Sequence, residues 1–308
     1  MYANEFVPEA QNTYRANFPG TYLDCRDIRE VRGSDILEAT GLDHIDVLDG
    51  SPPCCSFSAV GKGSKGWGEV RKYSDVKQRT DDLFFEWLRL LSELNPRGFL
   101  CENVPALAQG KNKGVLKEVL AEMRRLGYSV SARVVQAEWL GVPQARHRLL
   151  IMGSKCGAPS FPVPFERVCT MGEGLDGIDV DSAEAEDVSR ECARYKCGKM
   201  IKMVPKNPVR KLYARDYVKG AYFQLVRASM YEPAPTLTAT AGNLGAASFF
   251  HPLRDRKLTI SEAKRIQSLP DDFILTGTYQ QQIERIGRMV PPFVYREVSR
   301  CLANQLTR

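Results

Sequence analysis

The first 155 residues alternate short apolar runs with longer segments whose apolar residues recur at helical spacing. Four runs have the length and composition of buried strands: residues 45–48, 98–101, 130–136 and 148–153. The segments 80–94 and 115–126 repeat apolar residues every three or four positions, which predicts two amphipathic helices. Pro96 ends the first helix and Gly127 the second. Alternating strands and helices predict an α/β domain with a mostly parallel sheet.

This alternation stops near residue 157, where charge blocks, Pro and Gly become frequent. We interpret the region that follows as a second, smaller domain. Helical spacing returns at 261–269 and 292–306. The sequence therefore predicts three parts: an α/β domain at 1–156, a smaller domain at 157–253, and a C-terminal segment at 254–308 whose last helix packs back on the first domain.

Composition excludes several classes of protein. The chain has 308 residues, 43% of them hydrophobic and 26% charged, which is globular rather than disordered or fibrous. The uncharged stretch 233–253 contains three prolines and two glycines, so it is no membrane span. The N-terminal residues show no basic segment followed by an apolar one, so no secretory signal is expected. The nine scattered cysteines suit a reducing compartment. We expect a cytoplasmic, prokaryotic or phage-encoded protein without membrane association.

The positive charge is concentrated in one part of the chain. Residues 171–189 hold seven acidic residues and no basic ones, whereas residues 190–230 hold eleven basic and two acidic ones. Aromatic residues are interleaved with this basic block, as in proteins that bind a phosphate backbone. A solvated lysine-rich face gives the same pattern, so both interpretations stay open.

Reactive side chains follow two of the predicted strands. Cys54 follows 45–48 through a Pro-Pro turn, and Glu102 follows 98–101 directly. Carboxyl ends of parallel strands share one rim, where ligands bind, so both should project there. Arg146 and Arg148 precede a further strand and would favour the thiolate form of a nearby cysteine. Each residue alone is more often structural, so only the set indicates chemistry.

A series of short motifs runs along the chain in a fixed order. They are Ala3-Asn4-Glu5, Asp27-Ile28, Gly50-Ser51-Pro52-Pro53-Cys54-Cys55-Ser56-Phe57-Ser58, Glu102-Asn103-Val104, Gln144-Ala145-Arg146-His147-Arg148, Arg256-Lys257-Leu258-Thr259-Ile260-Ser261-Glu262 and Ile286-Gly287-Arg288-Met289-Val290-Pro291-Pro292. In order and spacing the chain resembles the DNA cytosine-5 methyltransferases over nearly its whole length. The resemblance implies a doubly wound, Rossmann-like methyltransferase sheet with a target-recognition domain at 157–253.

The resemblance implies roles for four catalytic residues. Cys54 would add to C6 of a cytosine flipped out of duplex DNA, so that C5 can accept a methyl group from S-adenosylmethionine. Glu102 would hydrogen-bond N3 and the exocyclic amine. Arg148 would reach the base O2 and hold Glu102, while Arg146 would hold a phosphate.

It also implies cofactor residues. Glu5 would accept the ribose hydroxyls, and Phe6 would stack on the adenine. Asp27 would take the adenine amine, with the Ile28 backbone beside it. Arg288 stands where the family has Asn, and its guanidinium would still bind the methionine carboxylate.

The segment 56–79 fits a loop that closes over the flipped base, although an ordinary Gly-rich surface loop has the same composition. Its candidate DNA contacts are Ser58, Lys62, Lys65, Arg71 and Lys72. Two other cysteines, Cys192 and Cys197, lack a second ligand pair, so no metal site is expected.

One family motif is missing from this sequence. The first strand and its turn, Phe-x-Gly-x-Gly-Gly, normally lie centrally in the sheet, and their loss would leave two strand edges unpaired at about 1–3 kcal/mol per buried group. A companion polypeptide or upstream coding sequence is expected to supply them. The alternatives are a catalytically impaired DNA-binding remnant, one subunit of a split methyltransferase, or an RNA cytosine-5 methyltransferase. A thiol hydrolase is disfavoured, since no histidine motif supplies a base. The sequence leaves open whether the enzyme serves restriction–modification.

Overall fold

The computed structural model describes residues 1–52, 71–73, 76–78 and 82–307. The chain divides into two compact units. The first consists of Met1–Val135, His147–Val163 and Arg296–Arg308, and the second of Gln136–Arg146 and Pro164–Tyr295. Among the residues so described, no helix is both long and apolar enough to cross a membrane.

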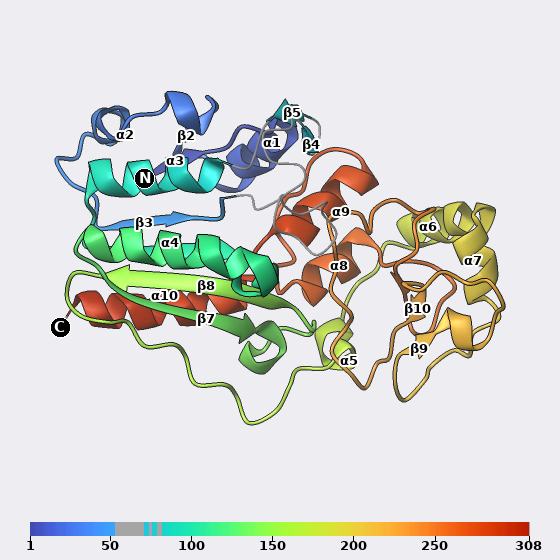
Figure 1. Ribbon diagram of the computed structural model, residues 1–308. Helices are drawn as coiled ribbons and strands as arrows, with labels where there is room; N and C mark the ends of the chain where they lie inside the picture. The colour runs from blue at the N-terminus through green and yellow to red at the C-terminus, as the bar shows by residue number, and fades with distance from the viewer. Residues whose placement is uncertain (53–70, 74–75, 79–81, 308) are drawn as a thin grey trace. The chain divides into compact units, whose positions relative to one another are not determined.

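A four-stranded sheet forms the centre of the first unit (Figure 1). Its strands, in spatial order, are β3 (Val47–Gly50), β6 (Gly98–Asn103), β8 (His147–Ser154) and β7 (Ser129–Gln136). β3 and β6 are parallel, with Gly50 opposite Cys101, whereas β8 runs antiparallel to β6, with Leu150 opposite Glu102. The four predicted strands all exist, with bounds shifted by a few residues, but the reversed β8 makes the sheet mixed.

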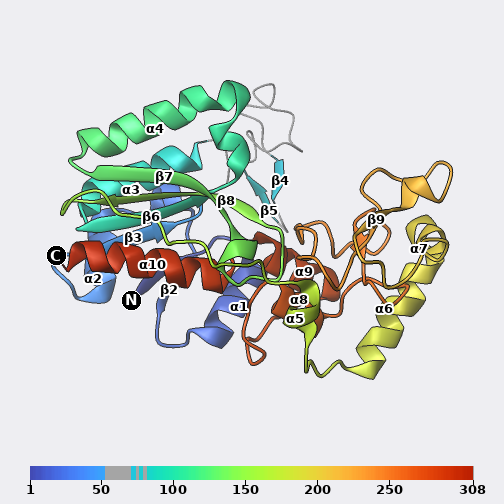
Figure 2. The same cartoon turned by 90° about the horizontal axis from the view of Figure 1, so that it is seen from below.

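Two amphipathic helices cover one face of this sheet, α3 (Leu83–Leu94) and α4 (Lys113–Arg125). Trp87 of α3 packs edge-on against Phe99 of β6, with ring centroids 5.6 Å apart. Figure 2 shows α4 on one side of the sheet and α10 (Pro292–Leu306) on the other. Both predicted helices are present, and α3 ends at Asn95, whose φ of 46° is left-handed.

The first 40 residues build a separate small sheet. β1 (Tyr2–Asn4) and β2 (Tyr22–Asp24) pair in parallel, and further elements of this part are α1 (Pro8–Asn17), η1 (Ile28–Glu30) and α2 (Gly33–Thr40). In the described part of the chain β1 pairs only with β2, and β3 only with β6. Tyr2 and Leu48 nevertheless pack on one apolar cluster from α2 and α3. The unpaired edges of β1 and β3 therefore both lie near α2 and α3. This is the place at which the sequence predicted that a strand is missing from the sheet.

Short elements complete the first unit and its junctions. They are the antiparallel pair β4 (Arg71–Tyr73) and β5 (Val76–Gln78), together with η3 (Pro105–Ala108), η4 (Gly110–Asn112) and η5 (Ala137–Leu140).

The second unit has little regular structure. Its elements are α5 (Met171–Leu175), α6 (Ser182–Arg194), α7 (Lys196–Ile201), β9 (Leu212–Tyr213), η6 (Ala214–Asp216), β10 (Val226–Arg227), β11 (Phe249–Phe250), α8 (Ile260–Ile266) and α9 (Tyr279–Arg288). One apolar core joins α5, α8 and α9 to residues 226–249. This shared core explains why residues 254–295 belong to the second unit, whereas the sequence-based division sets 254–308 apart.

Part of the basic block is buried rather than presented to solvent. Arg227 is fully buried, and its guanidinium donates to the carbonyl oxygens of residues 201, 204, 251 and 254. It also pairs with Asp255 at 2.7 Å. An irregular chain has few ladder partners for its carbonyls, and this one cation satisfies several of them.

Replacing Arg227 with Ala is expected to destabilise the protein by about 3–5 kcal/mol, because it leaves several carbonyl oxygens without their donor and Asp255 with Lys206 alone. Urea unfolding measures this difference. The matched change Arg190→Ala removes an exposed cation on α6 and should stay within about 0.5 kcal/mol of the parent. Equal stabilities for the two variants would contradict the anchoring role.

Candidate catalytic and cofactor-binding residues

Glu102 and Arg148, two candidate catalytic residues of the first unit, lie at one rim of the four-stranded sheet. β3 and β6 end there because they are parallel, and β8 begins there because it is antiparallel. Glu102 is the fifth residue of β6, and Arg148 is the second of β8. Strand register alone thus brings the two side chains to the same place.

Glu102 and Arg148 form an ion pair, with 2.9 Å between Oε1 and Nε. Both side chains are largely buried, with 10% and 17% exposure. Burial lowers the pKa of the Arg148 guanidinium, and the charge of Glu102 opposes this shift. A carboxylate held in this way has a fixed orientation, so it can hydrogen-bond a ligand with little reorganisation.

Asn103 fixes the chain that leads toward Cys54. Its side-chain amide donates to the carbonyl oxygen of Pro52 at 3.2 Å, and its Oδ1 accepts the N–H of Val104 at 2.9 Å. Only glycine fits at position 50, since a Cβ there would lie 2.5 Å from Nε1 of Trp87. Sequence reasoning missed the role of Asn103, although its place directly after Glu102 was a signal.

Several predicted residues fall outside the described part of the chain. These are Cys54, Cys55, Ser58, Lys62 and Lys65. The backbone of Arg71 and Lys72 belongs to β4, but their side chains are not among the described parts of the chain.

Arg146 belongs to the second unit and is fully buried there. Its guanidinium donates to the carbonyl oxygens of Leu237 at 2.9 Å, Gly287 at 2.7 Å and Met289 at 3.0 Å. This geometry favours a structural role over the expected phosphate contact, because both terminal nitrogens of the guanidinium already donate to main-chain oxygens.

A buried amide pair extends the Arg146 arrangement. Gln144 donates to Oε1 of Gln267 at 2.8 Å, and Gln267 donates to the carbonyl oxygen of Met289 at 2.6 Å. Arg288 therefore lies between two carbonyls that this network holds. Its own side chain is partly exposed and pairs with Glu284 at 2.9 Å.

The candidate cofactor residues of the first unit follow β1 and β2. Glu5 comes directly after β1, and its Oε1 accepts the N–H of Val7 at 2.8 Å. Phe6 beside it is half-buried. Asp27 follows β2 and caps η1 by accepting the N–H of Arg29 at 3.0 Å, with Ile28 next in the chain. Because β1 and β2 are parallel, both carboxylates lie at the same end of the small sheet.

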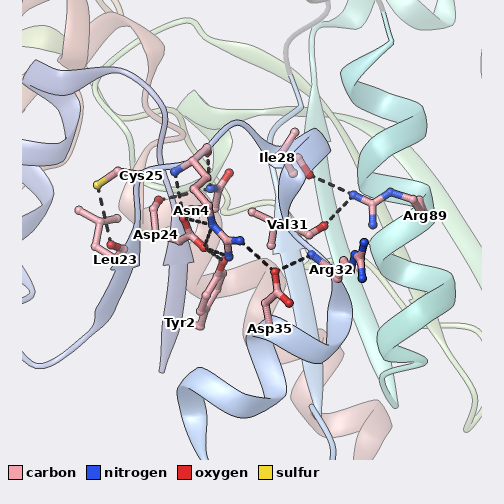
Figure 3. Close-up of polar contacts among 11 residues, drawn as sticks. Tyr2, Asn4, Leu23, Asp24, Cys25, Ile28, Val31, Arg32, Asp35 and Arg89 are labelled. Atoms are coloured by element: carbon pink, nitrogen blue, oxygen red, sulfur yellow. Dashed lines mark hydrogen bonds and ion pairs between the residues drawn. The ribbon is translucent and has the colours of Figure 1, made fainter.

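Helix α3 holds the segment that follows Asp27 (Figure 3). Arg89 donates to the carbonyl oxygens of Ile28 at 3.0 Å and Val31 at 2.8 Å. Four residues on, Glu93 accepts the N–H of Gly33 at 2.6 Å. Sequence reasoning considered only the apolar face of this helix and therefore missed both residues.

A second polar cluster ties β1 to β2 and α2. The Tyr2 hydroxyl donates to Oδ2 of Asp24 at 2.7 Å (Figure 3). Arg26 donates to Asp24 at 2.6 Å and pairs with Asp35 at 3.0 Å. Hydrogen bonds from Arg26 lower the pKa of Asp24 to about 2, outweighing its burial.

The family model for C-5 cytosine-specific DNA methylases matches residues 1–304. Curated relatives include the type II methyltransferase M1.HphI of Haemophilus parahaemolyticus, which is 27% identical over 98% of this chain and 80% of that protein. The type II methyltransferase M.XorII of Xanthomonas oryzae pv. oryzae is 29% identical over 92% of this chain and 74% of that protein.

Solved structures resemble the whole chain in fold. A protein assigned as a DNA modification methyltransferase of an Escherichia coli prophage covers all of this chain and 92% of its own, with a TM-score of 0.73 and 21% identity. A variant of DNMT2 from Spodoptera frugiperda gives a TM-score of 0.67 at 16% identity, over 100% and 92% of the two chains. These likenesses support the predicted methyltransferase-type α/β fold.

Substitution of Asp24 by Asn should destabilise the protein at neutral pH by about 1–2 kcal/mol, because a carboxylate with a depressed pKa stabilises the fold wherever it is ionised. The sign of this effect and the pH range in which it appears follow from the lowered pKa of Asp24. The contribution is complete above the ordinary pKa near 3.8 and disappears as the pH falls through about 2.

Urea unfolding at several pH values between 7 and 2 measures the effect. The control Asp179→Asn alters an exposed carboxylate of the second unit and should match the parent throughout. A difference between the Asp24→Asn variant and the parent that persists unchanged at pH 2 would exclude this linkage.

Proposed function

Because the chain belongs to the family of C-5 cytosine-specific DNA methylases, we propose that it transfers a methyl group from S-adenosylmethionine to C5 of a cytosine flipped out of duplex DNA. Its enzyme class, DNA cytosine-5 methyltransferase, follows from the family. The observation that carries the detailed proposal is the buried Glu102–Arg148 pair at the rim to which Pro52 leads.

In this proposal Cys54 acts as the nucleophile, and its sulfur bonds to C6 of the cytosine. The electron pair released into the ring makes C5 nucleophilic, so that C5 takes up the methyl group. Loss of the C5 proton then restores the double bond as the C6–sulfur bond breaks. Glu102 hydrogen-bonds N3 and the exocyclic amine, and Arg148 holds Glu102 and reaches O2. Such access to the ring requires the base to leave the stack.

The cofactor proposal rests on carboxylates at adjacent strand ends. Glu5 and Asp27 follow two parallel strands, an arrangement that suits ribose hydroxyls and an adenine amine. Phe6 stacks on the adenine, and the Ile28 backbone lies beside it. When bound, S-adenosylmethionine supplies an electrophilic methyl group. Arg288 remains a proposed ligand of the methionine carboxylate, in competition with its partner Glu284.

Duplex DNA is the proposed substrate, and the second unit the proposed reader of its sequence. Phosphate contacts are assigned to Ser58, Lys62, Lys65, Arg71 and Lys72. The two curated relatives named above are type II methyltransferases, so we assign this chain to a restriction–modification setting in the cytoplasm. No described contact favours the DNA-binding remnant or the RNA methyltransferase.

The open edges of β1 and β3 support one more proposal on partners. An additional parallel strand, from a companion polypeptide or from upstream coding sequence, would pair with both edges and carry the Gly-rich turn. A synthetic peptide of that motif should then tighten S-adenosylmethionine binding to the purified chain. Full affinity and turnover of the chain without the peptide would contradict this.

Methyl transfer to cytosine tests the function itself. Bisulfite sequencing should reveal methylated cytosines in DNA treated with the protein supplemented with that peptide, and Cys54→Ser should abolish them. Glu102→Gln should lower kcat by roughly 10²–10³-fold, because a preorganised partner of the developing charge is lost.

The matched control is Glu122→Gln, which alters an exposed carboxylate on α4 and should leave kcat unchanged. Undiminished methylation by the Cys54→Ser variant would overturn the proposed reaction.

Changing Arg89 to Met should weaken S-adenosylmethionine binding by at least about fivefold, since the carbonyls of Ile28 and Val31 lose a charged donor and the adenine segment loses its fixed position. Isothermal titration calorimetry measures this affinity. The control Arg125→Met removes an exposed arginine of α4 and should bind like the parent. Identical affinities of all three proteins would show that Arg89 does not position the site.

A further inference from the structure

The chain between β9 and β10 forms an exposed loop on a fixed base. The N–H of Ala214 donates to the carbonyl oxygen of Leu225 at 2.9 Å, which closes the loop. Both residues are fully buried in the core of α6 and α7. The adjoining β9–β10 pairing sets Tyr213 opposite Val226. The buried guanidinium of Arg227 in β10 donates to the carbonyl oxygen of Ile201 in α7. The loop therefore leaves the unit from a rigid base.

Within this loop Arg215 is clamped between two aromatic rings. Its guanidinium carbon lies 4.8 Å from the ring centroid of Tyr213 and 4.6 Å from that of Phe223. The Arg215 side chain is still 45% exposed, and its Nε lies 3.8 Å from Asp216, beyond hydrogen-bond distance. The rings fix the plane of the guanidinium while leaving the side chain open to a ligand.

The surroundings of Arg215 are unusual for a surface that faces only water. Phe223 is 68% exposed, although a phenyl ring gains most from burial. The other exposed side chains of the loop are those of Asp216, Tyr217, Lys219, Tyr222 and Gln224. Planar donors, amides and aromatic rings on a rigid projection are characteristic of surfaces that bind a structured partner.

We propose that Arg215 reads a guanine of the recognition sequence, by donating two parallel hydrogen bonds to O6 and N7 in the major groove. This inference rests on the proposed function, which supplies duplex DNA as the partner. A phosphate contact requires only a positive charge, whereas a bidentate contact requires a planar fork in a set orientation. The aromatic clamp provides that orientation before DNA binds, so less entropy is lost on binding.

Selection from a random duplex library tests the inference without requiring catalysis. The purified full chain and its Arg215→Lys variant each select DNA, and sequencing gives the base preference at every position. The variant keeps its charge but loses the fork. Its preference for guanine should fall by roughly 5- to 150-fold at one position and persist at the others. The salt dependence of binding should stay unchanged.

Two further variants complete the design. Phe223→Leu removes one ring and should weaken the guanine preference at that same position. Arg194→Lys makes the matched change at an exposed arginine of α6 that pairs with Glu191, and it should select the same sequences as the parent.

Three outcomes would overturn the inference: unaltered selection by Arg215→Lys, a uniform loss of affinity at all positions, or no sequence preference in the parent protein. Failure of the proposed function is detected separately, as absence of methyl transfer by a protein that still selects a sequence.

Discussion

The parallel register of β3 and β6 determines where the chain leaves the central sheet. Gly50 lies opposite Cys101, so the segment after β3 and the residues Glu102 and Asn103 emerge at one rim. The reversed direction of β8 then delivers Arg148 to the same rim. Backbone pairing, rather than any loop, thus supports the Glu102–Arg148 ion pair and the Asn103–Pro52 hydrogen bond.

In the second unit, buried cations satisfy main-chain carbonyl oxygens. Long irregular segments expose many carbonyl oxygens that no strand or helix satisfies, and buried cations serve them instead. Arg146, Arg227 and Lys257 each donate to three or more such oxygens. A sequence-based net charge therefore overstates the charge available to a partner, because some of these residues lie in the core.

The sequence predicted the part of the fold that follows from periodicity and failed where contacts are distant. α3, β6 and β8 were predictable, since their apolar patterns record burial directly. β3 and β7 are also present, although most of their side chains are at least partly exposed. The reversed β8 was not, because an apolar run carries no direction. Glu102 and Arg148 were found through their motifs, whereas Arg89 was missed because its carbonyl partners lie about sixty residues away. The buried contacts of Arg146 were missed for the same reason, because its carbonyl partners lie 91 to 143 residues away.

The separation of the β1–β2 sheet from the central sheet has a dynamic consequence. No strand-to-strand hydrogen bond within the described residues links β1 to β3. β1 and β2 are therefore attached to the rest of the unit by packing on α2 and α3, and by the hydrogen bonds of Arg89 and Glu93 to the segment 28–33. We therefore expect this N-terminal lobe, residues 1–40, to open without melting β6 or β8. Its backbone amides should exchange with deuterium well before those of β6, and any ligand bridging the lobe and the central sheet would slow that exchange.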